Sequence, residues 1–412
     1  PRRPAARVTP PEAAMADRPT VLCVASYYKG DRFLLRAKQE GCRVLLLTSE
    51  KFLNEPWPRQ AIDEVFALPH FQDRRLIVNA VSYLARTRPI RRVVALDDFD
   101  VEVAAHLREH LRLPGLGEST ARLFRDKLAM RTRARELGVR IPEFVGVVHH
   151  DEVRRFLAAV PGPWLLKPRG EASSIGIQKL HHPDEAWRAI ERLGDDQSFH
   201  LIERLVPGEL YHVDSLAADG RVVFAEVNKY FKPLLDVYQG GGVYATRTMP
   251  RDRPEVAALR EVNDKVLTGF GLTRGASHTE FMRAEGDGEF YFIETSARVG
   301  GANIAEMVEA ATGVNLWSEW AWLEAHPCDA YTPPPAKERY AGVVISLARQ
   351  EHPDTAAFAD PEIVHRLDKK HHVGFVVAAD EPGRVEELLT NYMDRIRRDY
   401  HTTLPPATSA TV

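Results

Sequence analysis

Hydrophobic and polar residues follow one another along the chain in patterns that predict both strands and helices. After Pro19, the apolar run VLCVAS precedes the helical stretch FLLRAKQEG and a second apolar run, RVLLLTS. This order is typical of a βαβ unit with parallel strands. A helix around Arg74–Thr87 and the strand RRVVALD extend the pattern. We expect residues 15–118 to form a Rossmann-like parallel-sheet domain, with Asp98 or Asp100 as a helix cap or, alternatively, in contact with a ligand.

The middle of the chain mixes helices with strands whose residues alternate in polarity. A helix is predicted from Ser119 to Leu137, and the next apolar strand delivers Lys167 to a loop rich in glycine and serine. Such a loop can wrap backbone N–H groups and hydroxyls around phosphates, although many ordinary hairpins have the same composition. Later, RVVFAEVNKYF is predicted to be a strand, and PLLDVYQGGGVYATRTMP a long loop.

The stretch from His278 to Gly301 is predicted to be a β-hairpin, because two alternating runs flank the turn EGDG. The expected register places Glu280 opposite Glu294, His278 opposite Ser296, and Met282 opposite Phe292. Like charges on neighbouring strands destabilise each other, so a divalent cation is expected to neutralise the acids. Two solvated acids on an exposed face are the alternative.

The residues that follow the hairpin suggest an anion site and then a C-terminal unit. Arg298, Gly300 and Gly301 can hold a phosphoryl group with a guanidinium and unhindered backbone N–H groups. An amphipathic helix in two pieces comes next, and then a linker, YTPPPAKE. Two strands and a helix follow it. The neighbouring His371 and His372 are expected to point to opposite faces of a strand and to bind no metal.

The composition and charge of the chain are typical of a globular protein. The chain has 412 residues, of which 44% are hydrophobic and 27% charged, and a net charge of −3, so we expect two or three packed units with no affinity for nucleic acid. Three scattered cysteines suggest a reducing cytoplasm rather than a disulfide framework. We identify no membrane-spanning run and no signal peptide. Residues 1–14 are expected to be a disordered extension or a remnant of expression.

The order of these features resembles that of the ATP-grasp superfamily. The resemblance rests on Lys127, Lys167, the Gly/Ser loop, Glu203 with Glu209, the two hairpin acids and Arg298. The leading domain and the piece GASHTEF are similar to carboxylate–amine ligases of the L-amino acid (dipeptide) ligase type. The resemblance implies an α/β and α+β architecture: an ATP-grasp fold at 119–330 with a lid at about 142–205, preceded by the Rossmann-like domain and followed by a small α/β extension at 331–412 packed on the core.

The resemblance also implies roles for individual residues. ATP would be bound by Lys127, Lys167, Gly170, Ser173, Ser174, Gly176, Glu203, Leu205, Val206 and Glu209. Among these, backbone groups around Glu203 to Val206 would meet the adenine edge, and Glu209 would hold the ribose hydroxyls. Glu280 and Glu294 would bind Mg²⁺. Arg298 and Gly301 would stabilise the acyl phosphate and the tetrahedral intermediate.

One position departs from the family pattern. The family usually has Asn two residues after the second acid, whereas this chain has Ser296. A hydroxyl is a poorer metal ligand than an amide carbonyl, so the sequence leaves open whether one or two Mg²⁺ ions, or Mn²⁺ in their place, are bound.

The predicted function is ATP-dependent formation of an amide or peptide bond, through an acyl phosphate made from an amino acid. The substrates are expected between the triglycine loop and the hairpin, where Lys229, Lys232, His278 and Asn303 are candidate ligands. An ATP-grasp carboxylase acting through carboxyphosphate is one alternative. A nucleotide-binding regulatory protein without turnover is the other. The resemblance also suggests a homodimer.

Overall fold

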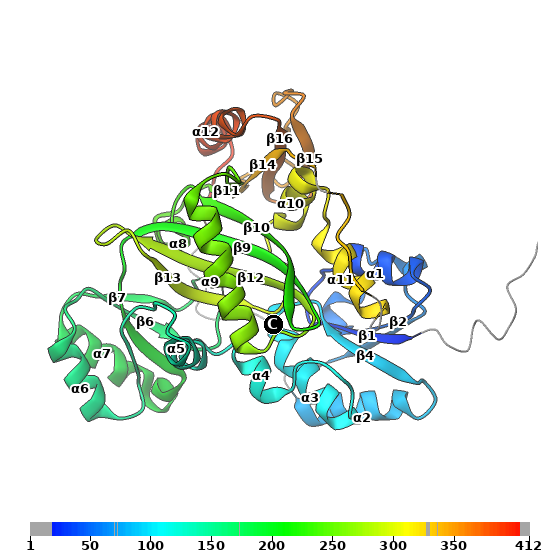
Figure 1. Ribbon diagram of the computed structural model, residues 1–412, viewed down its shortest axis with the longest axis horizontal. Coiled ribbons are helices and arrows are strands. Elements are labelled where there is room, and N and C mark those ends of the chain that lie inside the picture. Colours follow the sequence, from blue (N-terminus) through cyan, green and yellow to red (C-terminus); the bar gives the residue numbers. More distant parts are fainter. Residues whose placement is uncertain are drawn as a thin grey trace, which may run out of the picture.

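The computed structural model describes residues 19–403, except for 70, 72, 173, 327–329 and 336, and it also leaves the side chains of 238–240 undescribed. The predicted extension at 1–14 and the predicted ligand Ser173 therefore lie outside the described residues. Three β-sheets organise the chain (Figure 1). In that view the N-terminal unit is at the lower right, a lid unit at the lower left, and a large central sheet lies between and above them.

The N-terminal unit is the parallel α/β domain that the sequence predicts. Its sheet has the order β3-β2-β1-β4. The strands are β1 (Thr20–Ala25), β2 (Arg43–Ser49), β3 (Glu64–Leu68) and β4 (Ile90–Ala95). The helices are α1 (Asp31–Gln39), α2 (Arg74–Ala85) and α3 (Val101–Leu111). Every residue of β1 is buried, which explains its unbroken apolar run.

The predicted capping role of Asp98 and Asp100 is wrong. A short 3-10 helix, η4 (Asp98–Asp100), precedes α3, and Asp97 caps η4 by accepting from the N–H of Phe99. Asp100 instead accepts the N–H of Ser26 from the end of β1, at 2.8 Å. Asp98 is buried and lines a cavity beside the hairpin, so the segment after β4 supplies a cavity-lining side chain rather than a cap.

The single helix predicted from Ser119 to Leu137 is in fact two helices, α4 (Glu118–Arg122) and α5 (Lys127–Glu136). Asp126 separates them because its carboxylate accepts the N–H groups of Leu128 and Ala129 and so starts a new helix. Lys127 is consequently the first residue of α5, at its positively polarised N-terminus, where an anion is favoured.

The lid unit is a four-stranded antiparallel sheet of order β5-β8-β6-β7. Its strands are β5 (Phe144–Gly146), β6 (Trp164–Pro168), β7 (Gln178–Leu180) and β8 (His200–Arg204). The helices α6 (His150–Ala159) and α7 (Pro183–Leu193) cover its outer face (Figure 1). The loop between β6 and β7 is the predicted Gly/Ser loop.

The central sheet has eight strands in the order β13-β12-β9-β10-β11-β14-β16-β15. These are β9 (Gly208–Ala218), β10 (Arg221–Tyr230), β11 (Tyr244–Thr248), β12 (Gly275–Ala284), β13 (Phe290–Ser296), β14 (Tyr340–Leu347), β15 (Ile363–Arg366) and β16 (His372–Ala379). The sequence did not predict β15. The three C-terminal strands continue this sheet, so the predicted C-terminal addition is part of the central layer rather than a separate body.

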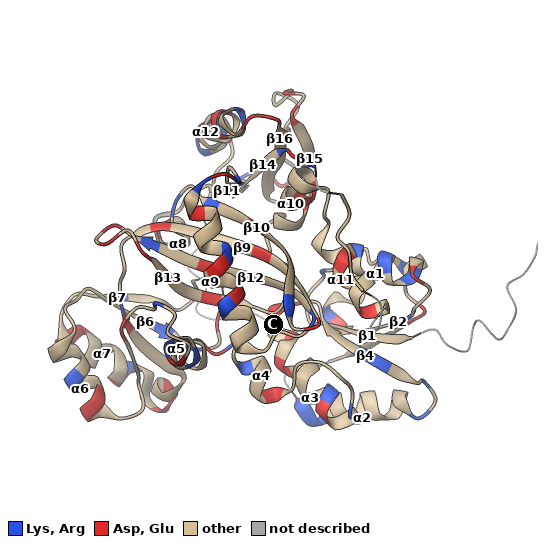
Figure 2. Ribbon diagram, viewed as in Figure 1, with Lys and Arg blue, Asp and Glu red and all other residues tan. Residues whose placement is uncertain are grey.

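Helices cover both faces of the central sheet. α9 (Pro254–Phe270) and α12 (Pro382–Asp399) pack on one face, and α10 (Ile304–Thr312) and α11 (Leu316–Ala325) on the other. The last two confirm the predicted two-piece helix. Acidic and basic residues are interspersed along α9 and the lid helices (Figure 2). Among the described residues, no helix is both long and apolar enough to span a bilayer.

The segment predicted as a long triglycine loop is largely ordered structure. It contains the helix α8 (Leu234–Gly240) and the strand β11, which pairs with both β10 and β14. Gly240 is the last residue of α8, and Gly241 and Gly242 lie in the short connection to β11, so the three glycines obscured the flanking elements in the sequence.

The predicted hairpin forms between β12 and β13 and has the expected register near the two acids. Glu280 lies opposite Glu294 and His278 opposite Ser296. Met282, however, lies opposite Tyr291 and not Phe292, because a β-bulge follows Glu280 and shifts the register by one residue. The prediction for Met282 is therefore wrong, whereas that for the acids is confirmed.

Candidate active site

Two adjoining cavities lie between the central sheet, the lid and the N-terminal unit. The first has a volume of about 520 Å³ and the second about 500 Å³, each within the usual size range of ligand pockets. Five residues line both of them: Lys127, Glu171, Leu234, Glu280 and Glu294. The cavities therefore meet at the pair of hairpin acids.

The two acids lie side by side on strands β12 and β13, each with one oxygen already engaged. Tyr230 donates its hydroxyl to Oε1 of Glu280 at 2.9 Å, and Lys127 Nζ lies 2.8 Å from Oε2 of Glu294. Burial alone would raise the pKa of Glu294, but the charge and hydrogen bond of Lys127 outweigh it and lower that pKa. Glu294 therefore stays ionised, and the oxygen-only donor set fits a hard cation such as Mg²⁺.

Lys127 and Lys167 reach the first cavity from different units. Lys127 donates to the backbone oxygen of Glu171 at 2.6 Å, which ties the Gly/Ser loop to α5. Lys167, on β6, pairs with Glu203 on β8. The second oxygen of Glu203 accepts from the guanidinium of Arg131 at 2.8 and 3.0 Å. The Glu203 side chain is thus an ionic anchor that positions Lys167.

Burial alone would raise the pKa of Glu203, but Arg131 and Lys167 lower it to about 2. Arg131 is completely buried and Glu203 almost completely. The carboxylate is therefore charged at any ordinary pH, and the triad joins the lid to the helix α5.

The Gly/Ser loop closes over the junction of the two cavities. Ser174 and Glu171 line the first cavity, and the backbone oxygen of Gly170 accepts from Arg125. Gly176 has a φ of 72°, and a Cβ there would lie 2.8 Å from Pro168, so glycine is needed at this turn.

The far end of the first cavity has an apolar lining. Leu205 and Val206, between β8 and β9, form part of it, and their predicted contact with adenine stays a prediction. Other apolar residues that line this cavity include Pro142, Leu165, Ile175, Ile177, Leu210, Met282 and Ile293. Such a wall suits a flat aromatic base better than a charged group.

The second cavity brings Arg298 and Gly301 to the acid pair. Asp98, from the N-terminal unit, pairs with Arg125, and its other oxygen lies 3.9 Å from Nε of Arg298. Burial alone would raise the pKa of Asp98, but Arg125 and Arg298 lower it. Sequence reasoning considered ligand contact at Asp98 but missed Arg125, which no motif signals.

His278 belongs to a buried polar cluster beneath the second cavity. Its Nδ1 lies 2.9 Å from Oδ1 of Asp214, and its Nε2 lies 3.5 Å from Glu280. His212 and Asn228 contact the other oxygen of Asp214, at 2.7 and 2.9 Å. Burial opposes the charge on His278, but Asp214 raises its pKa to about 9. The alternation of His212 and Asp214 in an apolar strand was a signal for this cluster that sequence reasoning did not use.

Three predicted ligands, Glu209, Lys229 and Lys232, line neither of the two cavities. Glu209 and Lys229 pair at 2.6 Å and line a separate cavity on the sheet face that α9 and α12 cover. Their predicted contacts with ribose and substrate do not agree with this placement, because alternate residues of a strand point to opposite faces and Gly208 and Leu210 face the first cavity. Lys232 is exposed. Asn303 begins α10, between the lining residues Ala302 and Ile304.

Comparison with known proteins agrees with this geometry. The ATP-grasp N-terminal domain matches residues 34–115, and the ATP-grasp domain matches residues 160–306. The L-arginine-specific L-amino acid ligase of Bacillus subtilis is 24% identical over 62% of this chain and 62% of its own length. The D-alanine–D-alanine ligase of Prosthecochloris aestuarii is 29% identical over 37% of this chain and 44% of its own length. The chain thus spans less than two thirds of either relative.

A solved structure shares the whole architecture. The L-amino acid ligase from Bacillus licheniformis has a TM-score of 0.71 to this chain, and the match covers 94% of this chain and 100% of the ligase. The two are 18% identical, so the likeness supports the fold alone. The predicted fold, a parallel-sheet domain followed by an ATP-grasp domain, is confirmed. Both of these sequence relatives are named as amino acid ligases, in agreement with the predicted class of enzyme. The chain therefore contains an ATP-grasp N-terminal domain and an ATP-grasp domain, in agreement with its fold.

Proposed function

We propose that this protein is an ATP-dependent carboxylate–amine ligase, which forms an amide or peptide bond through an acyl phosphate and releases ADP and phosphate. The observation that carries the proposal is the junction of the two cavities at Lys127, Glu280 and Glu294. A nucleotide in one cavity and a carboxylate in the other would meet where cationic and metal-binding groups are concentrated, as phosphoryl transfer requires.

Each predicted nucleotide ligand that lines the first cavity has a role in this arrangement. The base would lie against Leu205 and Val206, with the phosphates directed toward Lys167 and Lys127. Glu280 and Glu294 would hold one or two Mg²⁺ ions, or Mn²⁺ in their place, and the metal would neutralise charge on the phosphates. Ser296 also lines the second cavity and offers only a weak ligand for a second ion.

The chemistry then follows from the positions of the protein groups. A carboxylate oxygen of the acid attacks the terminal phosphorus, the bond to the leaving ADP oxygen breaks, and an acyl phosphate forms. The amine nitrogen attacks the acyl carbon, phosphate leaves, and the nitrogen loses a proton to solvent. Arg298 and the backbone N–H of Gly301 would stabilise the oxyanion of that step. The Gly/Ser loop would exclude water from the labile acyl phosphate.

The proposal extends to setting and assembly. The protein would act in the cytoplasm on small carboxylates and amines, in agreement with the small-molecule ligases it resembles. It would form a homodimer, which size-exclusion chromatography with light scattering would test directly.

The test is a phosphate-release screen over pairs of amino acids and small carboxylates, with mass spectrometry of the products. We expect a pair that gives stoichiometric ADP, phosphate and amide. Release that depends on bicarbonate and needs no amine would indicate a carboxylase instead. ATP binding without turnover across the panel would indicate a regulatory protein.

A further inference from the structure

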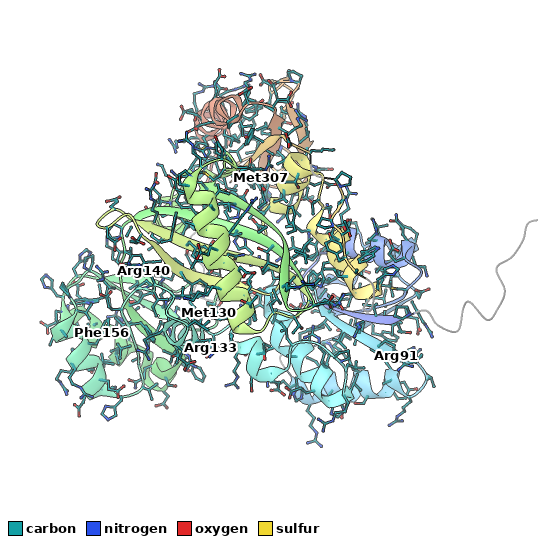
Figure 3. The ribbon with its side chains drawn as sticks, in the orientation of Figure 1. Arg91, Met130, Arg133, Arg140, Phe156 and Met307 are labelled. Carbon is teal, nitrogen blue, oxygen red and sulfur yellow. The ribbon has the colours of Figure 1, made fainter. Side chains whose placement is uncertain are left out.

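The second cavity has two chemically different ends. Its polar end contains the acid pair, Arg298, His278 and the ion pair of Asp98 with Arg125. Its other end is lined by Val237 of α8, Tyr244 of β11 and Ile345 of β14, none of which is among the residues that line the first cavity. Met130 of α5, another lining residue, is labelled near the middle of the molecule in Figure 3.

The apolar end is built on sheet strands rather than on loops. Tyr244 and Ile345 are directly opposite each other on β11 and β14. The rings of Tyr230 and Tyr244 meet edge to face, with centroids 5.8 Å apart. Gly374 lies opposite Ile345 on β16, and a Cβ there would come within 2.9 Å of Ile345 Cγ1. The strands therefore hold Ile345 in place, and the wall has a fixed shape.

Several charged groups of the cavity already have partners, whereas Oε2 of Glu171, at the junction with the first cavity, is buried with no hydrogen-bond partner among the described residues. Asp98 pairs with Arg125, Glu294 with Lys127, and His278 with Asp214. Among the described residues at the apolar end, His372 is the one titratable group besides the tyrosines; its Nδ1 contacts a backbone oxygen, and burial lowers its pKa. A charged side chain placed against this wall would lose its hydration without gaining a counter-charge.

The donor acid has only one orientation that joins the two cavities. Its carboxylate must reach the shared boundary to receive the phosphoryl group, so the rest of the molecule extends away from the first cavity. Tyr244 and Ile345 line the second cavity but not the first, so their surface is available to the rest of the molecule. We propose that the acid activated by this enzyme carries a large apolar side chain, of the size of leucine, methionine or phenylalanine, bound against Tyr244 and Ile345. This inference rests on the proposed ligase function.

Hydroxylamine trapping tests the inference, because it converts an acyl phosphate to a hydroxamate and so reports which acid is activated, independently of the amine. The panel contains leucine, methionine and phenylalanine, with alanine, glutamate and arginine for comparison. We expect hydroxamate mainly from the large apolar acids. Hydroxamate from arginine or glutamate, but not from these, would overturn the inference and leave the ligase function standing. Both the inference and the ligase function would be overturned if no acid gave a hydroxamate, or if bicarbonate were the only substrate that gave one.

Substitutions at the wall locate the site. Ile345→Trp fills the apolar end, so we expect the KM for leucine to rise at least about tenfold while the KM for ATP and for alanine changes little. Ile345→Ala tests the wall without added bulk and should shift the preference toward phenylalanine. The matched control is Val364→Trp, at a half-exposed position on the edge strand β15 of the same sheet. Equal changes in the KM values for leucine and ATP, or an unchanged acid preference in both Ile345 variants, would contradict the assignment.

Discussion

The buried triad of Glu203, Arg131 and Lys167 permits a quantitative prediction. Glu203→Gln keeps the shape of the side chain but leaves two buried cations without their counter-charge. The pKa of Glu203 is lowered from 4.5 to about 2, and this difference of about 2.5 units corresponds to about 3 kcal/mol of stability. Removal of one partner of a buried ion pair typically costs about 3–5 kcal/mol, which agrees.

The contribution of Glu203 to the free energy of unfolding should decrease at acid pH. Because the folded-state pKa is lowered, the contribution of Glu203 is fully present above pH 4.5 and is lost as the pH falls toward 2. Wild-type protein should therefore lose more stability than Glu203→Gln over this range. Thermal midpoints measured in steps from pH 5 to acid give the comparison.

Hydrogen exchange shows where the loss occurs. We expect the amides of β6 and β8 to exchange faster in Glu203→Gln, because the triad holds the lid against α5. The matched control is Glu143→Gln on the same unit, whose partner Arg204 is 2.7 Å away in an exposed pair, and its effect should be close to zero. A Glu203→Gln protein with wild-type exchange and an unchanged thermal midpoint would refute the reasoning.

Three further outcomes follow from the described contacts. Glu294→Gln should abolish Mg²⁺-dependent ADP release without changing the far-ultraviolet circular dichroism, and retained turnover would exclude Glu294 as a metal ligand. The pKa of His278 is raised from 6.5 to about 9, so in the metal-free protein this group contributes stability below pH 6.5 that is lost as the pH rises through 9. Asp214→Asn should reduce this loss, and thermal midpoints measured at pH 6 and pH 10 would show the difference. Gly342→Ala would place a Cβ 2.3 Å from Leu389 of α12 and should cost about 1–3 kcal/mol in urea unfolding, whereas Gly383→Ala, with open space around it, should not destabilise the protein.

The sequence predicted those parts of the site that depend on local pattern. The turn EGDG and the alternation around it were enough to pair Glu280 with Glu294. The bulge after Glu280 could not be predicted, because an inserted residue becomes visible only when both strands are paired. The break between α4 and α5 was readable in principle, since Asp126 is a strong N-cap residue.

Roles taken from the family order were less secure than those taken from strand periodicity. Glu209 follows Glu203 in the expected order, but the turn at Pro207-Gly208 starts a new strand, and its alternation sends Glu209 to the opposite face. Arg125 lies in a short connection between two helices, where no periodicity shows its direction. Its contacts with Asp98 and the Gly170 carbonyl arise only when three units come together.

The strand order of the eight-stranded sheet determines which parts of the protein can fold first during its synthesis. β14 lies between β11 and β16, and both Ile345 and His372 line the second cavity, so a ribosome must deliver the chain to about residue 379 before the cavity can form. The lid and the N-terminal unit consist of strands closer together in the chain and can fold earlier. A nascent or prematurely ended chain would thus have the lid but an incomplete second cavity, and under the proposed function it could not couple ATP consumption to bond formation.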